Sequence, residues 1–561
     1  MTAFVGVDVG TGSARAGVFD AKGKLLASHA QDIQMWREGE IAEQSSDDIW
    51  KAVCTCVKAA VTEAAVAPSS VMGIGFDAAC SMVVLDRDLR PITISATGET
   101  TRNVIVWMDH RAKEQAARIN AQGHPVLDYV GGRISPEMQT PKLLWIKENL
   151  AQTFADAGQF MDLPDYLTWA ATGSLTRSAC TVTCKWTYLA HEERWDDSYF
   201  HQIGLGSLAD EGFVRIGKQI VPPGTALAKG LTATAAQQMG LPAGIAVGAA
   251  LIDAHAGGIG TVGADPDAGA EATMAYVFGT SACTMASSGA PHKVPGVWGP
   301  YYSAMVPGLW LSEGGQSAAG EAIAQLISTH PSFGEAANRA KKEGLSTQDF
   351  LLHEVIRRAP DNSSAVELAG RRVIVPDFLG NRAPFAAQNA TAVMSGLTQH
   401  SGLDDLIATY LACVYGIGYG LRQIMEAQKR KGVAPGSIVI SGGAGRSAAI
   451  KQMLADASGF PFLSTTSEEP VLLGAAMLGA VSAAHFPSLS VAMQQMSSVQ
   501  DRFWPVSGLI GKQHDARFKA FEALQKADHQ FTEDLSILSR QTGDKSADAP
   551  ARSDKMAPKA L

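Results

Sequence analysis

Short apolar segments separated by glycine-rich turns fill the beginning of the chain. Residues 4–10, 16–20 and 25–27 each have the composition of a strand, and glycine, hydroxyl and lysine residues lie between them. Connections this short predict a hairpin followed by a third strand. A helix is predicted to begin near residue 44, where serine and aspartate precede apolar residues at helical spacing.

The apolar segments that follow are strands again. Residues 71–76 and 82–85 are continuous apolar runs, and the first of them ends at Asp77. Three strands, a helix and further strands are the order in which a ribonuclease-H-like ATPase domain begins. The sequence therefore predicts such a domain at the start of the chain.

The glycines of the first turn, Gly10 and Gly12, precede a strand. A Rossmann or Walker A motif requires a helix at that point, so both are excluded. A hairpin tip with glycine and hydroxyl residues can still bind phosphate through its backbone N–H groups. A plain hairpin turn is the alternative, and for this motif alone it is the favoured interpretation.

The same pattern returns after a turn-rich connection at residues 265–269. Residues 274–278 predict a strand, and the turn Gly279-Thr280-Ser281 follows it. Residues 406–425 carry apolar side chains at three- and four-residue spacing, which predicts a buried helix. A strand at 437–441 leads into another glycine turn. The chain thus contains two related cycles of strand and glycine turn.

An apolar run at residues 244–252 predicts one buried strand that stops at Asp253. Small residues and glycines follow, so another backbone or a ligand can approach closely. An isolated aspartate at a strand end is more often a turn or a helix cap than a catalytic group. Its partners elsewhere in the chain decide between these alternatives.

Two further segments carry candidate chemistry. Trp107, Asp109, His110 and Arg111 follow an apolar strand, where they predict either contacts to sugar hydroxyls or a salt-bridged helix start, at even odds. Lys185 lies in an otherwise uncharged run. Such a lysine either extends its amine to solvent or holds a polar ligand.

Composition narrows the class of protein. The 561 residues are 46% hydrophobic and 18% charged, with a formal net charge of -9. The acidic balance disfavours nucleic acid and anionic membrane as partners. The seven cysteines include no CxxC pair, so we expect small core residues in a reducing cytoplasm. We also expect no leader and no membrane span.

These patterns give an expected domain organisation. The N-terminal domain is predicted at residues 1–264 and the C-terminal domain at 265–490. A helical extension follows at 491–534. Residues 535–561 are mainly serine, aspartate, lysine, alanine and proline, which predicts a disordered tail.

The motifs in this order resemble the FGGY carbohydrate kinases from about residue 4 to 485. The segments that carry the resemblance are 6–13, 107–111, 253–257, 279–281 and 441–443. The resemblance implies an α/β protein of the actin/hexokinase/Hsp70 ATPase type. Such a protein has two ribonuclease-H-like domains, each a mixed sheet flanked by helices, with a cleft between them.

Four segments are similar to the D-ribulokinase branch, namely 76–81, 103–111, 184–188 and 378–382. A glycerol kinase would carry Arg-Glu where this chain has Ala79-Cys80. The resemblance implies an ATP-dependent kinase that converts D-ribulose into D-ribulose 5-phosphate. The alternatives are a kinase of L-ribulose, xylulose or ribitol, and a non-catalytic sugar sensor or assembly ATPase on the same fold.

The resemblance also implies roles for particular residues. Asp253 would be the general base, and Asp8 would hold Mg²⁺ through water, with Asp253 as a second metal-site residue. Sugar-binding residues would be Asp77, Ala79, Asp109, Arg111, Lys185, Asp253 and Glu313, of which Asp77, Asp109 and Arg111 are supports. Nucleotide-binding residues would be Thr11, Gly12, Ser13, Arg15, Gly279, Thr280, Ser281, Gln316, Gly442, Gly443, Ala444 and Ser447.

Three positions differ from what the branch usually carries. Threonine is common where Ala79 lies, histidine where Thr284 lies, and asparagine where Ser447 lies. These differences bear on the preferred sugar and on the adenine contact, and leave the base and the phosphate turns in place. From the family we also expect a homodimer.

Overall fold

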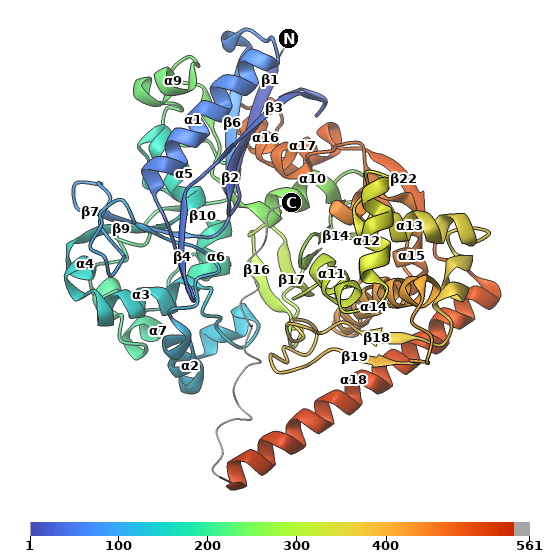
Figure 1. Ribbon diagram of the computed structural model, residues 1–561. Helices are drawn as coiled ribbons and strands as arrows, with labels where there is room; N and C mark the ends of the chain where they lie inside the picture. The colour runs from blue at the N-terminus through green and yellow to red at the C-terminus, as the bar shows by residue number, and fades with distance from the viewer. Residues whose placement is uncertain (1, 543–561) are drawn as a thin grey trace.

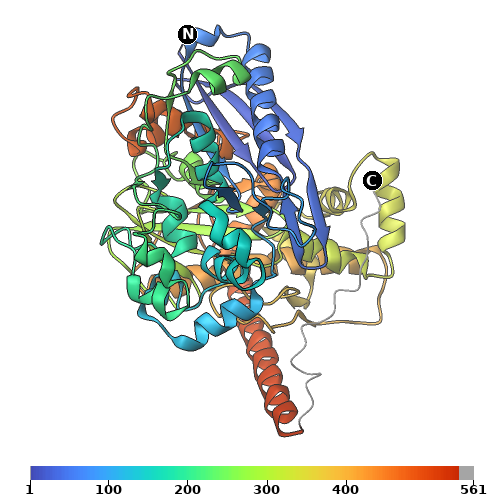
Figure 2. The same cartoon turned by 90° about the vertical axis from the view of Figure 1, so that its left-hand side faces the viewer.

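The computed structural model describes residues 2–542. Figure 1 shows two halves, each with its own sheet and surrounding helices, and α10 (Asp253–Val262) and α16 (Pro470–Ser482) where the halves meet. Figure 2 shows the first strands and the helix beside them from the side. No helix within residues 2–542 is long and apolar enough to cross a membrane.

The N-terminal sheet has the predicted hairpin at its centre. Strands β1 (Ala3–Val9), β2 (Ser13–Asp20) and β3 (Leu25–Asp32) are antiparallel, and β6 (Val71–Ala78) joins β1 in parallel. Helix α1 (Ser46–Glu63) covers one face and begins as predicted, because the Ser45 hydroxyl accepts a hydrogen bond from the N–H of Asp48.

The prediction of one continuous strand over residues 244–252 is wrong. Two short strands, β12 (Ala246–Val247) and β13 (Leu251–Ile252), pair with β6, and the residues between them leave the ladder. There the N–H of Ala249 donates to the carbonyl of Thr225 instead. Asp253 follows β13 directly and is the first residue of α10.

The C-terminal half repeats the N-terminal topology. Strands β14 (Thr273–Phe278) and β15 (Ala282–Ser288) form an antiparallel hairpin, and β20 (Ser437–Gly442) joins β14 in parallel. The strand order of this sheet is β16-β17-β15-β14-β20-β21-β22. The two expected ribonuclease-H-like domains are therefore present. The other strands of the C-terminal sheet are β16 (Trp298–Tyr302), β17 (Trp310–Gln316), β21 (Phe462–Thr465) and β22 (Val499–Phe503).

Smaller sheets and many helices complete the two halves. The remaining strands are β4 (Met35–Glu38), β5 (Ile41–Gln44), β7 (Met82–Asp86), β8 (Val104–Ile105), β9 (Ala157–Asp162), β10 (Arg177–Ser178), β11 (Ile220–Val221), β18 (Val373–Val375) and β19 (Val393–Ser395). The remaining helices of the N-terminal half are α2 (Lys113–Gln122), α3 (Gln139–Asn149), α4 (Ala151–Asp156), α5 (Leu163–Thr172), α6 (Ala179–Trp186), α7 (Asp197–Gln202), α8 (Gly206–Asp210) and α9 (Ala233–Met239). Those of the C-terminal half are α11 (Gly320–Ser328), α12 (Phe333–Lys342), α13 (Thr347–Arg358), α14 (Leu403–Arg430), α15 (Ala448–Ser458), α17 (Leu489–Met496) and α18 (Gly508–Thr542).

Helix α16 lies directly on the backbone of the N-terminal sheet. A Cβ atom on Gly73 would lie 2.0 Å from the carbonyl oxygen of Gly479, and one on Gly75 would lie 2.0 Å from that of Ala475. Only glycine permits two backbones to approach this closely. On its other side α16 meets α10, where a Cβ on Gly260 would lie 2.0 Å from the carbonyl of Pro470. These glycines fix the place of α10, and therefore of Asp253.

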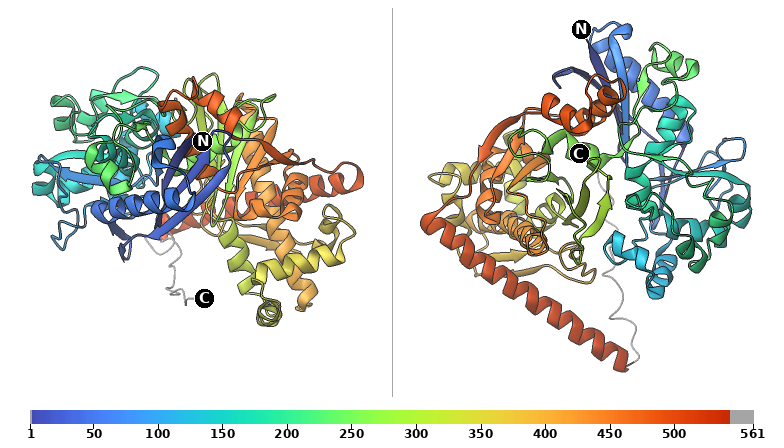
Figure 3. Two further views of the ribbon diagram at one scale, coloured as in Figure 1. Left: turned by 90° about the horizontal axis from the view of Figure 1, so that it is seen from above. Right: turned by 180° about the vertical axis from the view of Figure 1, so that it is seen from behind.

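The end of the chain differs from the expected tail. Helix α18 continues through Thr542, so the prediction of disorder is wrong for residues 535–542. Residues 543–561 of the predicted tail lie outside the described residues. The views in Figures 2 and 3 agree that the last part of α18 extends away from the rest of the chain.

We expect Gly73→Ala to destabilise the protein, because its new methyl group would overlap the Gly479 carbonyl. Overpacking in a tight interior costs about 1–3 kcal/mol, and a backbone atom cannot rotate away as a side chain can. The thermal unfolding midpoint should decrease by several degrees. Gly334→Ala is the matched control, since this exposed helical glycine has open space around its Cβ position. Equal midpoints for the two variants would contradict the close approach.

Candidate active site

Three aspartates lie at the carboxyl ends of neighbouring parallel strands. In the register of β1 and β6, Asp8 pairs with Asp77, and Asp77 pairs in turn with Leu251 of β13. Asp253 lies two residues after Leu251, directly after the end of β13. Because these strand ends meet at one edge of the sheet, the fold places three carboxylates side by side.

Burial and mutual repulsion raise the pKa of two of these carboxyl groups. Asp77 is fully buried, and neither of its carboxyl oxygens has a hydrogen-bond partner within residues 2–542. Burial first, and then the charge of Asp8, raises its pKa well above the ordinary value. The same two causes raise the pKa of Asp253 to about 6, against a hydrogen bond from the N–H of Ala254. Asp253 can therefore accept a proton near neutral pH.

Arg15 connects this cluster to helix α16. Its Nε and Nη2 donate to Oδ2 of Asp8 at 2.9 and 2.5 Å, and its Nη1 donates to Glu469 at 2.9 Å. Glu469 occupies the N-cap position of α16, where its side chain bonds Arg15 and makes no capping hydrogen bond. A direct contact from Arg15 to phosphate stays a prediction, since all three of its nitrogens have protein partners.

The first glycine turn contains backbone N–H groups that are available to a ligand. The N–H of Gly10 donates to the carbonyl of Ser13, whereas those of Thr11 and Gly12 have no partner within residues 2–542. The Thr11 hydroxyl accepts a hydrogen bond from the indole of Trp107 at 2.9 Å. Unpaired N–H groups in a tight turn are suited to binding phosphate oxygens.

The second turn has the same internal hydrogen bond. The N–H of Gly279 donates to the carbonyl of Ser281, and those of Thr280 and Ser281 lack partners in the described chain. Gly279 and Thr280 are exposed. The two turns are therefore equivalent in geometry as well as in sequence.

The predicted adenosine-binding turn follows β20. Gly442 has a φ of 86°, and a Cβ there would lie 2.3 Å from the carbonyl of Phe278, so glycine is required. Gly443 and Ala444 lie in the single 3₁₀ turn Gly443–Arg446. The Ser447 hydroxyl caps α15 by accepting from the N–H of Ile450. Contacts of this turn with adenosine stay a prediction.

Gln316 is engaged at both ends of its amide. It accepts a hydrogen bond from the Tyr276 hydroxyl at 2.8 Å and donates to the carbonyl of Ile417 at 2.9 Å. These contacts join β14, β17 and α14 behind the second turn. They give Gln316 a structural role, and its contact with nucleotide stays a prediction. Thr284, on the adjacent strand β15, is buried, and its hydroxyl has no hydrogen-bond partner in the part of the chain that the structure describes.

Two of the predicted sugar-binding residues, Lys185 and Glu313, lie beside the indole ring of Trp298. The amine of Lys185, in α6, lies 5.3 Å from the ring centre of Trp298, and the guanidinium of Arg382 lies 5.7 Å from it. Glu313 is buried on the neighbouring strand β17. Burial alone would raise the pKa of Glu313, but Lys185 and His255 lower it to about 2. Ala79 follows β6 and is buried too.

A buried polar chain joins these residues to α10. Nδ1 of His255 lies 3.1 Å from Sγ of Cys180, and its Nε2 lies 3.5 Å from Oε2 of Glu313. Burial opposes charge on the imidazole, yet Cys180 and Glu313 raise the pKa of His255 to about 10. The sequence interpretation of every cysteine as a small core residue missed this contact.

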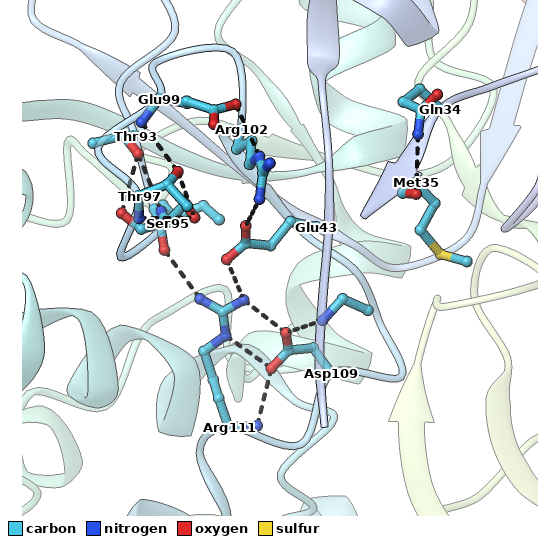
Figure 4. Close-up of polar contacts among 12 residues, drawn as sticks. Gln34, Met35, Glu43, Thr93, Ser95, Thr97, Glu99, Arg102, Asp109 and Arg111 are labelled. Carbon is cyan, nitrogen blue, oxygen red and sulfur yellow. Dashed lines mark hydrogen bonds and ion pairs between the residues drawn. The ribbon is translucent and has the colours of Figure 1, made fainter. Parts of the chain in front are cut away.

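Asp109 and Arg111 form the salt-bridged alternative considered for their motif (Figure 4). Arg111 donates to Asp109 through Nε at 2.9 Å and through Nη2 at 2.7 Å, and Nη2 also reaches Glu43. Asp109 additionally accepts from the N–H of Ala42. Both side chains are buried and engaged, so they support the neighbouring Trp107. Direct contact with sugar stays a prediction.

The carboxylates Asp8, Asp77 and Asp253 fit a cation that keeps most of its water. Within residues 2–542, no group of three or more metal-binding side chains has the geometry to enclose a metal ion. Magnesium is commonly bound by one or two carboxylates with waters and substrate phosphates. The partnerless oxygens of Asp77 and the crowding of negative charge are consistent with that mode.

Comparison with known proteins decides the family. Residues 3–260 match the N-terminal domain of the FGGY family of carbohydrate kinases, and residues 274–483 match its C-terminal domain. The chain belongs to this family. It is therefore a sugar kinase, a phosphotransferase.

Several FGGY relatives are similar over nearly the whole chain. The human FGGY carbohydrate kinase domain-containing protein is 44% identical, over 95% of this chain and 98% of its own. A D-ribulokinase of Saccharomyces cerevisiae is 37% identical over 86% of this chain and 72% of its own. The xylulose kinase of Lactobacillus acidophilus, 18% identical, superposes with a TM-score of 0.76 over 95% of this chain and 100% of its own. That last likeness confirms the fold.

We expect kcat/KM of this FGGY kinase for its sugar to decrease as the pH falls below about 6. Asp253 must be unprotonated to accept a proton, and burial with Asp8 raises its pKa to about 6. Each pH unit below the pKa removes about tenfold of the active form. Initial rates between about pH 5 and 8 measure this, with unfolding midpoints at each pH as the control. A rate that stays constant down to about pH 5 would contradict the assignment of Asp253 as base.

Proposed function

We propose that this FGGY kinase transfers the γ-phosphoryl group of ATP to D-ribulose and forms D-ribulose 5-phosphate. The observation that carries the proposal is the place of Asp253. Its carboxyl group, with a pKa of about 6, lies at the start of α10 beside Asp8 and Asp77. Similarity to the yeast D-ribulokinase over most of the chain supports the choice of sugar.

Asp253 is the general base of the proposed reaction. Its carboxylate accepts the proton of the sugar hydroxyl as that oxygen attacks the γ-phosphorus. Positioned acid–base groups contribute about 10²–10⁴-fold to a rate. Burial first, and then the nearby charge of Asp8, raise the pKa of Asp253 and make it a stronger base than an exposed aspartate.

The two glycine turns neutralise and orient the phosphates. The N–H groups of Thr11 and Gly12 face them from one half, and those of Thr280 and Ser281 from the other. Phosphoryl transfer depends mainly on such positioning and on charge stabilisation. Asp8 would hold Mg²⁺ through water, and the ion would supply charge neutralisation on the phosphate oxygens.

Lys185 and Glu313 are the proposed contacts to the sugar hydroxyls. A buried ammonium donates to oxygens and a buried carboxylate accepts from hydroxyls, so the pair orients a polyol by both kinds of hydrogen bond. Ala79 adds no polar group. Pentuloses differ in the direction of one or two hydroxyls, which changes only one or two hydrogen bonds. L-Ribulose, xylulose and ribitol are therefore the alternatives within the same reaction.

We expect D-ribulose to stimulate ADP release most strongly when the wild-type protein is supplied with Mg-ATP. The comparison panel contains L-ribulose, D- and L-xylulose, ribitol, glycerol and a blank without sugar. Stronger stimulation by another sugar would overturn D-ribulose and keep the kinase. Asp253→Asn is the control, since it should retain ADP binding by calorimetry while turnover decreases about 10²–10⁴-fold.

Lys185→Ala should raise KM for the sugar far more than KM for ATP. A hydrogen bond from a charged group is worth about 1.5–3 kcal/mol, which corresponds to roughly ten- to a hundredfold in kcat/KM for the sugar. Steady-state kinetics with each substrate varied in turn separate the two effects. Lys51→Ala is the control, because Lys51 is an exposed helical lysine of α1. A larger change in KM for ATP would remove Lys185 from the sugar site.

A further inference from the structure

The loop of residues 377–391 lies against the strands that carry Trp298 and Glu313. A Cβ on Gly296 would lie 1.9 Å from the carbonyl oxygen of Pro384. A Cβ on Gly314, the neighbour of Glu313, would lie 3.4 Å from the methyl group of Ala383. The loop therefore touches the segment before β16 and the middle of β17. Arg382 is the charged residue that it brings to this place.

Arg382 lies over the same indole ring as Lys185. Its guanidinium lies 5.7 Å from the ring centre of Trp298, the ring that also receives Lys185. Its Nη1 donates weakly to Sγ of Cys283 at 3.8 Å, two residues after the second glycine turn. The guanidinium thus lies between that turn and the residues proposed to hold the sugar.

The charge of Arg382 acts on the same carboxyl groups as Lys185. It helps Lys185 and His255 to lower the pKa of Glu313, against the effect of burial. It also helps to lower the pKa of Glu137, where burial again opposes and His110 contributes more. Electrostatics and geometry therefore place Arg382 at one site.

Arg382 has donors left for a ligand. Arginine carries five N–H donors, and the contact to Cys283 is the one hydrogen bond its guanidinium makes within residues 2–542. No carboxylate lies within ion-pair distance of it in that range. The buried guanidinium of Arg111, by contrast, is held by Asp109 and Glu43. A half-buried arginine with unused donors beside Lys185 and Glu313 is placed to bind oxygen atoms of a substrate.

Helix α18 holds the loop from the opposite side. The amide of Gln525 donates to Asp377 at 3.1 Å, and Asp377 accepts from Asn381, the residue before Arg382. At the far end of the loop, Asp528 accepts from both the hydroxyl and the N–H of Thr391, at 2.6 and 3.0 Å. The loop is therefore tied to α18 at its beginning and at its end.

We propose that Arg382 is a sugar-contacting residue of this kinase, and that α18 positions it through Gln525 and Asp528. The planar fork of the guanidinium would donate to two neighbouring oxygens of the polyol, which an ammonium cannot do with the same geometry. The C-terminal extension would then contribute to substrate binding without touching substrate. This inference rests on the proposed function in one respect, that the group around Trp298 binds the sugar.

The first experiment compares Arg382→Ala and Arg382→Lys with the wild type. We expect Arg382→Ala to raise KM for the sugar at least tenfold while KM for ATP changes less than about twofold. Arg382→Lys should recover only part of this loss, and added methylguanidinium should partly restore Arg382→Ala. Arg430→Ala, at the exposed end of α14, is the matched control.

The second experiment tests α18 by substitutions on one helix. Gln525→Ala and Asp528→Ala should raise KM for the sugar, whereas Gln530→Ala and Asp534→Ala, whose side chains bond only each other across one helical turn, should not. Gln525→Ala combined with Arg382→Ala should add little to Arg382→Ala alone, because both act through one contact. A merely destabilising substitution would instead add its full effect and lower the unfolding midpoint.

Each experimental outcome tests one part of the proposal: the substrate, the contact of Arg382 with the sugar, or the role of α18. The variants are compared with whichever sugar of the panel the wild type uses best, so a preference other than D-ribulose overturns the substrate and not the role of Arg382. An unchanged KM for the sugar in Arg382→Ala, or an equal rise for ATP, overturns the contact. Additive effects of Gln525→Ala and Arg382→Ala overturn the positioning role of α18.

Discussion

The active site depends on backbones that touch without side chains between them. Helix α16 lies on the glycines of β1 and β6, and α10 crosses α16 where Gly260 meets the carbonyl of Pro470. Because nothing but hydrogen separates these backbones, neither helix can shift without a clash or a void. Asp253 is the first residue of α10. Its distance from the ends of β1 and β6 is therefore set by close packing instead of by a flexible side chain.

Crowded charge is the second constraint. Three carboxylates meet at one edge of a sheet, and burial together with repulsion raises the pKa of two of them. Arg15 balances part of this charge and is itself held by Glu469 of the second half. Such an arrangement costs stability in the folded protein and is tolerated where it serves chemistry. The same burial and repulsion that lower the stability raise the pKa of Asp253 and make it more basic.

Local patterns in the sequence predicted the parts of the site that are built locally. The hairpins around Gly12 and Thr280 need only strand and turn residues close in sequence, and both are present. Asp253 could be singled out at a strand end, but its base role came from the family motif. The segment 244–252 could not be predicted as two strands, since its partner Thr225 is remote from the strand pattern.

Contacts between distant segments escaped prediction altogether. Cys180 and His255 are far apart in the chain, and neither has a neighbour in sequence that points to the other. The same holds for Gln525 and Asp377, which lie on a helix and a loop separated by most of the C-terminal half. The extent of α18 past residue 535 was missed because the whole segment was interpreted as a disordered tail, although Leu535, Ile537 and Leu538 are apolar.

The placement of α16 has a consequence for how the chain can be divided. This helix belongs by sequence to the second half, yet it covers the face of the first sheet. A fragment ending at residue 264 would leave the backbone of β1 and β6 bare, with apolar neighbours such as Phe4 uncovered. The complementary fragment would carry α16 with no surface to receive it. The two halves therefore fold as one cooperative unit. The N-terminal half cannot complete its core until α16 has been synthesised.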